Sequence, residues 1–407
     1  MSHSDPTETA GPGASSPGMG PTPRAAEPRP ESAQRAATEG VRLVELFASR
    51  GFTRVEPPVL QPLEPFLDLS GEELRRRMFV TTDAEGRELC LRPEYTIPVS
   101  RLHLASRPAR ASAAYAYLGP VFRFRQGESG EFTQAGIEDF GREDREAADA
   151  ETLDLALEAL SELGAGATAT LIGDVGLFTA LLSAMRLSGS TARRLKRNYA
   201  AGKTDARALH GLASPNEAQN RHAGLLAALQ GQDPAAARLF VEDILSIAGI
   251  ATLGGRSASQ IAARFLEQAS TDPVGLSLEQ VATLERFLAI TGHPDEAAEA
   301  LRAFASDAKL DLSAAIDRLE IRNGFLEARG IDLSSLKVAT GFGRNLDYYT
   351  GFVFEITEVR EGARPLVGGG RYDGLLRRLG AAGDVPAVGC SLWLDRLAAR
   401  GSAAGTP

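Results

Sequence analysis

Residues 119–141, with the sequence GPVFRFRQGESGEFTQAGIEDFG, combine two sets of polar side chains that suit different ligands. The later part, FTQAGIE, places Gln134 and Glu138 in a pattern suited to holding a small amino acid. The earlier part carries Arg123 and Arg125 and continues into an acidic loop. An arginine side chain has only hydrogen-bond donors, so these two side chains cannot accept a hydrogen bond from a ligand. The stretch therefore predicts an amino-acid site beside a region of different chemistry.

Three further segments stand out, on both sides of a long region rich in alanine and leucine. They are LRPEYT at 91–96, GRNLDYYTGFVFE at 343–355 and GGGRYDGL at 368–375. Together with residues 119–141 they resemble the histidyl-tRNA synthetases, a family of class II aminoacyl-tRNA synthetases. LRPEYT is similar to the LRPEGT of that family, and the two later segments match its histidine-specific motifs almost letter for letter. The resemblance covers most of residues 34–400.

The resemblance implies a pocket for free histidine. This molecule has an ammonium group, a carboxylate and an imidazole, so a selective pocket needs acceptors, a cationic clamp and a way to read the ring. A guanidinium fork suits the two oxygens of a carboxylate. By resemblance, the ammonium group is received by Glu94, Thr96 and Gln134, the carboxylate by Arg344, the imidazole N–H by Glu138, and the ring by Tyr349 and Tyr372.

Other interpretations stay open for several of these segments. Glu94 and Arg344 could instead form structural ion pairs. Tyr348 is expected in the core, because neighbouring strand residues face opposite ways and Tyr349 is taken to face the pocket. The glycines at 368–370 are of a type common in turns, and no Lys-Ser/Thr follows them, so they do not form a phosphate-binding loop. No spacing suits a metal site, and we expect neither a metal nor a cofactor.

Three departures from the family pattern fall on the side where the synthetases bind ATP. Arg125 replaces the glutamate that accepts a hydrogen bond from the adenine amino group. The loop at 126–131 is short and acidic where the family has a longer basic loop, so its charge has the wrong sign for phosphate. Trp393 takes the place of a glycine that permits close approach of the purine, although a purely structural role for the indole stays open. The expected degenerate nucleotide site is Arg123, Arg125, Trp393 and Arg396.

A chain that keeps the amino-acid side and loses the nucleotide side resembles the regulatory subunits of ATP phosphoribosyltransferase. The resemblance implies a non-catalytic protein that joins a short-form catalytic subunit in the first step of histidine biosynthesis and takes part in feedback inhibition by histidine. We also expect self-association, and neither a nucleic acid nor a membrane as partner. Only eleven residues follow Arg396, too few for the anticodon-binding domain of a synthetase.

Two alternatives are kept. One is a truncated synthetase-like ligase that activates histidine with ATP, as the retained arginines Arg123, Arg344 and Arg396 would allow. The other is a free-standing histidine sensor. In the regulatory interpretation, the glycine-rich segment and the loop at 123–131 are expected to become ordered when histidine binds.

The elements that must position these residues are short strands and helices. Runs of strands joined by turns, without regular helical crossovers, predict an α+β fold with a class II synthetase-like antiparallel sheet flanked by helices. Helices are expected at 33–50, 96–106 and 146–163, with the last one starting near Cys390. Strands are expected at 52–59, 78–82, 88–92, 114–124, 131–140, 167–172, 336–341 and 351–357.

Composition divides the chain into a core, an insertion and two tails. Residues 1–32 are rich in Pro, Gly, Ser and Ala and predict a disordered tail. Residues 177–320 lose strand character and predict a helical insertion, whose basic run at 193–197 is interpreted as a solvated helix face or a protein contact. The synthetase-like core is then 33–176 with 321–400, and 401–407 form a second tail.

Composition also limits the function. A chain of 407 residues, 43% of them hydrophobic, can form two or three domains. Its formal net charge of −9 argues against a protein that mainly neutralises a nucleic-acid backbone. Cys90 and Cys390 lie in apolar segments and are expected to be buried thiols in a reducing compartment. Since no apolar run reaches the roughly 18 residues of a membrane span and no secretion signal is present, we expect a cytoplasmic protein.

Overall fold

The computed structural model describes residues 30–69, 72–126, 128–204, 276–344 and 346–399, with 209–210, 239, 243, 252–253 and 256–257 in between. The tail expected at 401–407, nearly all of the tail expected at 1–32 and much of the insertion expected at 177–320 lie outside these residues. No helix in this part of the chain is long and apolar enough to cross a membrane.

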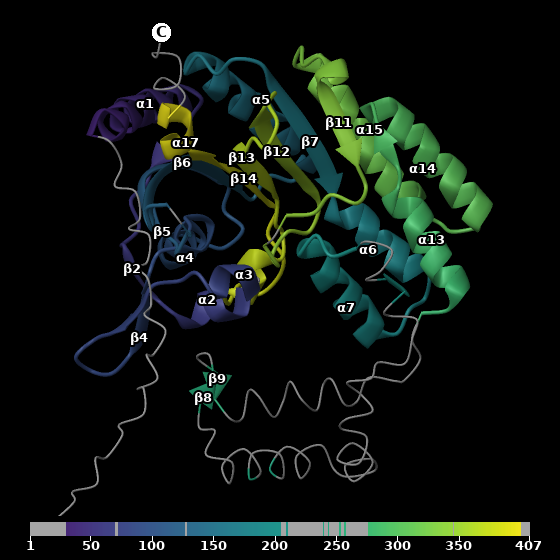
Figure 1. Cartoon of the computed structure of the whole chain (residues 1–407), viewed down its shortest axis with the longest axis horizontal. Helices are drawn as coiled ribbons and strands as arrows, with labels where there is room; N and C mark the ends of the chain where they lie inside the picture. The colour runs from purple at the N-terminus through teal and green to yellow at the C-terminus, as the bar shows by residue number, and fades with distance from the viewer. Residues whose placement is uncertain are drawn as a thin grey trace, which may run out of the picture.

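A nine-stranded sheet forms the centre of the described chain (Figure 1). Its strands pair antiparallel except for β1 with β5 and β11 with β7, which confirms the expected α+β fold. In spatial order they are β1 (Thr53–Arg54), β5 (Ala113–Phe122), β6 (Glu131–Phe140), β14 (Ala387–Trp393), β13 (Pro365–Arg371), β12 (Phe352–Glu358), β7 (Thr168–Asp174), β11 (Leu336–Ala339) and β10 (Thr291–Gly292).

Two smaller sheets accompany it. The first has the order β2 (Leu60–Pro62), β4 (Glu88–Leu91) and β3 (Val80–Thr82). The second joins β8 (Thr252–Leu253) to β9 (Arg256–Ser257).

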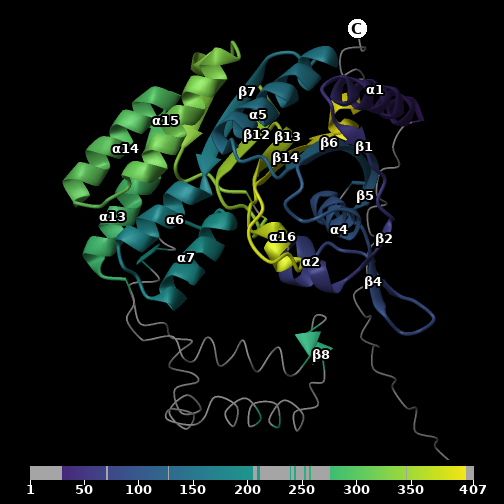
Figure 2. The same cartoon turned by 180° about the vertical axis from the view of Figure 1, so that it is seen from behind.

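One face of the central sheet is covered by α1 (Pro30–Ser49), α5 (Arg145–Glu162) and α17 (Leu394–Ala399) (Figures 1 and 2). In α1, Leu43 and Phe47 lie one turn apart and are fully buried, so they form the apolar stripe that faces the sheet. The helix starts at Pro30, three residues before its expected start, because proline is accepted at the first helical position. Gly51, with φ +90°, follows its end.

The opposite face carries α2 (Glu64–Leu69), α4 (Thr96–Ser106) and α16 (Leu375–Arg378), with the short α3 (Glu72–Arg75) nearby. Alternate residues of β5 serve the two layers: Tyr115 and Tyr117 face α4, and Ala116 faces α1. Tyr117 stacks on Tyr95, with ring centroids 4.2 Å apart. This aromatic layer supports the site described below.

A separate group of helices packs beside β7 and β11 (Figure 1). They share a hydrophobic cluster that includes Phe178, Tyr199 and Phe287. Ser277 and Gln280 form a capping box at the start of one of them. The helices are α6 (Val175–Ala184), α7 (Gly189–Ala200), α13 (Leu278–Leu288), α14 (Pro294–Ala308) and α15 (Ser313–Ala328), followed by the short η1 (Leu333–Ser335). The insertion boundaries at 177 and 320 stay a prediction.

A buried ionic network joins α15 to the sheet. Arg322 of α15 lies 3.1 Å from Asp174 and 3.6 Å from Asp149 of α5. Asp149 also lies 2.7 Å from Arg371, at the end of β13. Each of the four side chains is at most 9% exposed. Because a buried charge without a partner is strongly destabilising, α5, α15 and β13 are held in one relative arrangement.

Two expectations about local structure are wrong. Residues 387–393 form β14, hydrogen-bonded to both β6 and β13, and the last helix begins only at Leu394; sheet pairing overrides the local helical pattern. The glycines at 368–370 lie inside β13, paired with β12 and β14, so they do not form a turn; ordering of this segment when histidine binds stays a prediction. The other expected elements lie within a few residues of their expected bounds, although the strand at 52–59 is reduced to β1.

Candidate functional site

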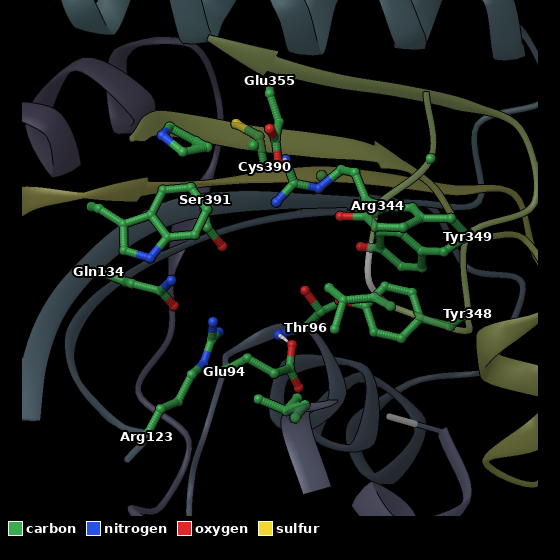
Figure 3. A pocket seen from close by; sticks show the side chains of 18 of the residues that line it. Glu94, Thr96, Arg123, Gln134, Arg344, Tyr348, Tyr349, Glu355, Cys390 and Ser391 are labelled. Carbon is green, nitrogen blue, oxygen red and sulfur yellow. Dashed lines mark hydrogen bonds and ion pairs between the residues drawn. The ribbon is translucent and has the colours of Figure 1, made fainter. Parts of the chain in front are cut away.

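A cavity of about 330 Å³ lies on the sheet face that carries α4 (Figure 3). It is bounded by β6, β13 and β14, the first turn of α4 and the loop before β12. Its volume is at the lower end of the roughly 300–1,000 Å³ of typical ligand pockets, which suits a small metabolite. Six residues expected to bind histidine line it: Glu94, Thr96, Gln134, Arg344, Tyr349 and Tyr372.

Hydrogen-bond acceptors gather on one side of the cavity. Glu94 accepts from the backbone N–H groups of Thr96 (2.7 Å) and Ile97 (2.9 Å), so it also caps α4. Burial raises the pKa of Glu94, and these hydrogen bonds and the charge of Arg123 partly offset the effect. Gln134 Oε1 is buried without a protein partner among the described residues. Since buried polar atoms are rarely left unpaired, this oxygen is available to a donor on a ligand.

The seventh expected residue, Glu138, lies beneath the cavity and not in its wall. Its Oε1 accepts from Thr96 Oγ1 at 2.7 Å, and its Oε2 accepts from the hydroxyl of Tyr372. Gly389 pairs with Glu138 across β14 and β6, and a Cβ there would overlap the carboxyl group. Burial raises the pKa of Glu138 to about 8. Burial thus favours the protonated form of this carboxyl group, while the hydrogen bonds from Tyr372 and Thr96 favour the ionised form.

Arg344 lies across the cavity from Gln134 and Glu94 (Figure 3). Its Nη1 donates to Phe354 O (3.1 Å) and to Glu355 Oε1 (2.8 Å), so the ion-pair interpretation of this arginine is correct in part. Its Nε is buried without a protein partner among the described residues and is the donor left for a ligand. The guanidinium lies over Gly368, where any side chain would collide with it.

Tyr348 is buried in a core cluster as expected, at 3% exposure, and it lines the cavity together with Tyr349. The two residues lie in a turn and not in a strand, and strand alternation does not apply to them. Their ring centroids are 5.0 Å apart, and Tyr372 lies 5.7 Å from Tyr348. The three rings form the aromatic side of the cavity.

On the side expected to be the degenerate nucleotide site, Arg125 does not line the cavity. Its guanidinium lies 4.0 Å from the centroid of the Phe132 ring. It pairs with Glu128 (2.9 Å) and Asp395 (3.1 Å). Glu128 also pairs with the exposed Arg364, so this glutamate of the acidic loop is engaged by two arginines. The sequence suggested that Arg125 would present hydrogen-bond donors to a ligand. Its guanidinium instead covers the face of the Phe132 ring.

The other three residues of that group, Arg123, Trp393 and Arg396, line the cavity. Arg123 Nε donates to Pro93 O at 2.5 Å, and burial lowers its pKa to about 10. Trp393 pairs with Gln134 across β14 and β6, and Arg396 lies 4.7 Å from the centroid of its indole. The indole thus belongs both to the aromatic layer of the core and to the cavity wall.

Sequence reasoning missed several residues of the wall. Glu355 could have been found, because it ends a segment that was singled out and lies opposite Gly368 on the neighbouring strand. Ser391 and Cys390 are in the motif whose strand was taken for a helix. Arg77 comes from a segment that carries no recognisable signal.

The antiparallel sheet, the capped helix α4 and the cavity define a class II aminoacyl-tRNA synthetase-like protein. The sequence profile of the family described as histidyl-tRNA synthetase matches residues 25–242 and 256–397. Two solved structures share the fold. An ATP phosphoribosyltransferase regulatory subunit/histidyl-tRNA synthetase from Bacillus halodurans has a TM-score of 0.62 at 22% identity, covering 94% of this chain and 84% of that one. A histidyl-tRNA synthetase from Nostoc sp. PCC 7120 has 0.61 at 19%, covering 95% and 76%.

Relatives with higher sequence identity show to which family the chain belongs. An ATP phosphoribosyltransferase regulatory subunit of Mesorhizobium japonicum is 42% identical over 89% of this chain and 97% of its own length. A second protein of that name, from Allorhizobium ampelinum, is 41% identical over 87% of this chain and 95% of its own length. The chain belongs to the family of ATP phosphoribosyltransferase regulatory subunits.

The buried carboxyl group of Glu138 should make stability depend on pH. Its pKa of about 8 in the folded protein lies above the roughly 4.3 of a glutamate in an unfolded chain. Between these values the folded protein holds a proton that the unfolded chain has lost, so Glu138 stabilises the fold fully at low pH and less as pH rises. Between pH 5 and 8, the free energy of unfolding of the natural protein should fall by at least about 1 kcal/mol more than that of Glu138→Gln. Urea unfolding of both proteins measures this; a difference that stays constant over the range contradicts the assignment.

Proposed function

We propose that this chain is the non-catalytic, histidine-sensing subunit of an ATP phosphoribosyltransferase whose catalytic subunit is of the short form. In this role it is required for the first step of histidine biosynthesis and mediates feedback inhibition by histidine. One observation carries the proposal. The cavity keeps unpaired polar groups for an amino acid, while Arg125 and its partners cover the neighbouring Phe132 ring.

The polar groups complement a histidine zwitterion. An ammonium group fits between Gln134 Oε1 and the carboxylate of Glu94, and the carboxylate of the ligand faces Arg344 on the other side. The imidazole then points to Thr96, Tyr372 and the carboxyl group of Glu138 below them. Burial raises the pKa of Glu138, so its carboxyl group and the imidazole can share one proton between them and no unpaired charge is buried.

The same geometry opposes the use of ATP. An adenine ring that stacked on the outer face of Phe132 would have to displace a guanidinium that pairs with two carboxylates. Arg123 and Arg396 still line the cavity, which is the observation that favours the alternative, a ligase that activates histidine. The two functions differ in one reaction, the formation of an adenylate.

Feedback requires that histidine bind the inactive arrangement of the complex more tightly than the active one. A ligand shifts an equilibrium only by its difference in affinity for the two states, commonly about 1–3 kcal/mol. The catalytic subunit is thus expected to lower the affinity of the cavity for histidine when the complex is active.

Calorimetry and pyrophosphate exchange test the function together. We expect the purified protein to bind histidine, with a change in the fluorescence of Trp393 in the cavity wall, and to show no exchange of pyrophosphate into ATP in the presence of histidine. We also expect it to copurify with a phosphoribosyltransferase and to be needed for its activity. Clear exchange would overturn the regulatory function in favour of the ligase, and a protein that never associates with the transferase would be a free-standing sensor.

Glu138→Ala should weaken histidine binding by about 2–3 kcal/mol, since the imidazole loses its hydrogen-bond partner in a buried site. Association with the catalytic subunit should persist because Glu138 is 1% exposed. Asp139→Ala is the matched control: its carboxyl group is also buried, on the next residue of β6, but it pairs with Arg142, whereas Glu138 bonds to the cavity residues Thr96 and Tyr372. Equal affinities of Glu138→Ala and the natural protein in calorimetry would refute the role of Glu138.

We also propose that the protein self-associates through the small sheet. Four apolar side chains of β2, β3 and the residues before them are exposed: Val59 (37%), Leu60 (50%), Phe79 (39%) and Val80 (53%). Leu60 and Phe79 both lie opposite Leu91 of β4 and share one face of the small sheet, whereas Val59 and Val80 lie opposite its neighbours Arg92 and Cys90 and face the other way. The proposed contact is therefore the face that carries Leu60 and Phe79. A grouped apolar surface of this kind is typical of a protein interface.

The unpaired, buried Cys90 and Cys390 fit a reducing compartment, and we place the protein in the cytoplasm.

Replacing both Leu60 and Phe79 by aspartate should convert the oligomer to a monomer, because two charges would be buried at the contact. Light scattering after size exclusion measures the mass. Val359→Asp, at an apolar position that is 65% exposed elsewhere on the surface, is the control and should leave the mass unchanged. If the double variant keeps its mass but loses the catalytic subunit, the surface belongs to that partner and not to a second copy.

A further inference from the structure

The loop at 340–343 leads directly to Arg344 and is held from outside the sheet. Thr340 bonds through both its backbone N–H and its hydroxyl to Ile290 O, each at 3.1 Å. Gly341 packs against the backbone of Leu288, where a Cβ would lie 3.0 Å from the carbonyl oxygen. Both partners belong to the end of α13 and the residues after it. The backbone that carries the cationic side of the cavity is thus fixed by the group of helices beside β7 and β11.

Tyr199 of α7 also holds this loop, through contacts with two of its residues. Its hydroxyl donates to Thr340 O (2.9 Å) and to Phe342 O (2.8 Å), so one proton is shared by two carbonyl groups of the loop. The ring is 1% exposed and stacks on Phe178 of α6, with centroids 4.2 Å apart and planes at 11°. Burial raises the pKa of Tyr199, so the hydroxyl stays a donor at any physiological pH. Tyr199 itself does not line the cavity.

The next residue of the loop, Gly343, lies against the same tyrosine. A Cβ at position 343 would lie 2.9 Å from Tyr199 Cε1 and 3.0 Å from Tyr199 O. The loop therefore follows the surface of α7 at the closest distance that a glycine permits. A shift of α7 relative to the sheet would move residues 340–343, and Arg344 with them.

We propose that Tyr199 is a positioning residue of the amino-acid site: through the loop at 340–343 it sets where Arg344 meets the carboxylate of the ligand. The inference rests on the proposed histidine site and deepens it. It gives the helical region, which sequence analysis could only describe as an insertion, a part in recognising one end of the ligand. The acceptor side and the floor, formed by Gln134 and Glu138, are built by β6 and do not contact Tyr199.

The test separates this role from a general loosening of the pocket. Tyr199→Phe keeps the ring stacked on Phe178 and removes only the shared hydrogen bond. We expect histidine affinity to fall about tenfold, whereas the affinity for histamine, which lacks the carboxylate, stays as in the natural protein. Calorimetry or Trp393 fluorescence measures both. Tyr115→Phe is the matched control, since its buried hydroxyl pairs with His103 away from the cavity, and it should change neither affinity.

Gly343→Ala provides a second variant, because its methyl group would push the loop away from α7 without altering Tyr199. It should show the same selective loss for histidine. Equal weakening of both ligands in both variants, or no weakening of either, would overturn the positioning role. If the natural protein binds neither ligand, the proposed histidine site is wrong. If the natural protein binds histidine but the variants lose no selectivity, only the positioning role of Tyr199 is wrong.

Discussion

The burial of one ionisable group, Glu138, constrains the rest of the site. A carboxyl group in the middle of a sheet is tolerated only when its oxygens find hydrogen-bond partners. Here the partners come from different elements: Thr96 from the start of α4 and Tyr372 from the residue after β13. Room for the group is left by Gly389 on the strand between them. The helix and three strands must therefore keep one register, and the cavity above inherits its shape from that requirement.

The polar groups of the cavity and those of the neighbouring region around Arg125 differ in whether they have hydrogen-bond partners. At the acceptor end and at the opposite arginine, Gln134 Oε1 and Arg344 Nε have no protein partner among the described residues. Beside them, Arg125 is fully engaged by Glu128 and Asp395 over the ring of Phe132. Unpaired buried groups favour a ligand that supplies the missing hydrogen bonds, whereas groups already paired must first be separated. The protein thus favours a small zwitterion without any change in its framework.

Much of this arrangement could be predicted from the sequence, because its motifs are contiguous. The motif residues were expected in one pocket, and Gln134 and Arg344 do line one cavity. What failed depends on tertiary contacts. Local periodicity could not show that residues 387–393 would be drawn into the sheet by two neighbours. Tyr348 lies in the core as expected, but its second role in the cavity wall was missed, because strand alternation does not apply to a residue in a turn. The positive charge of Arg125 was evident from the sequence. Its partner Asp395 lies 270 residues away in the chain, so only the folded structure shows that the two side chains pair.

A regulatory site must exist in two arrangements that differ in ligand affinity, and the structure limits where that difference can arise. The floor is held within the sheet by Glu138 and the elements bonded to it, so altering it would separate several buried hydrogen bonds at once. The backbone before Arg344 is held instead by α7 and α13, which belong to a different hydrophobic cluster. Since the buried ionic network fixes α15 to α5 and β13, a movement that alters the loop at 340–343 would involve α7 and α13 and not the whole group of helices. Under the proposed function, the carboxylate end of the cavity is where a partner bound elsewhere would alter the affinity for histidine, because the loop before Arg344 depends on how α7 and α13 sit against the sheet.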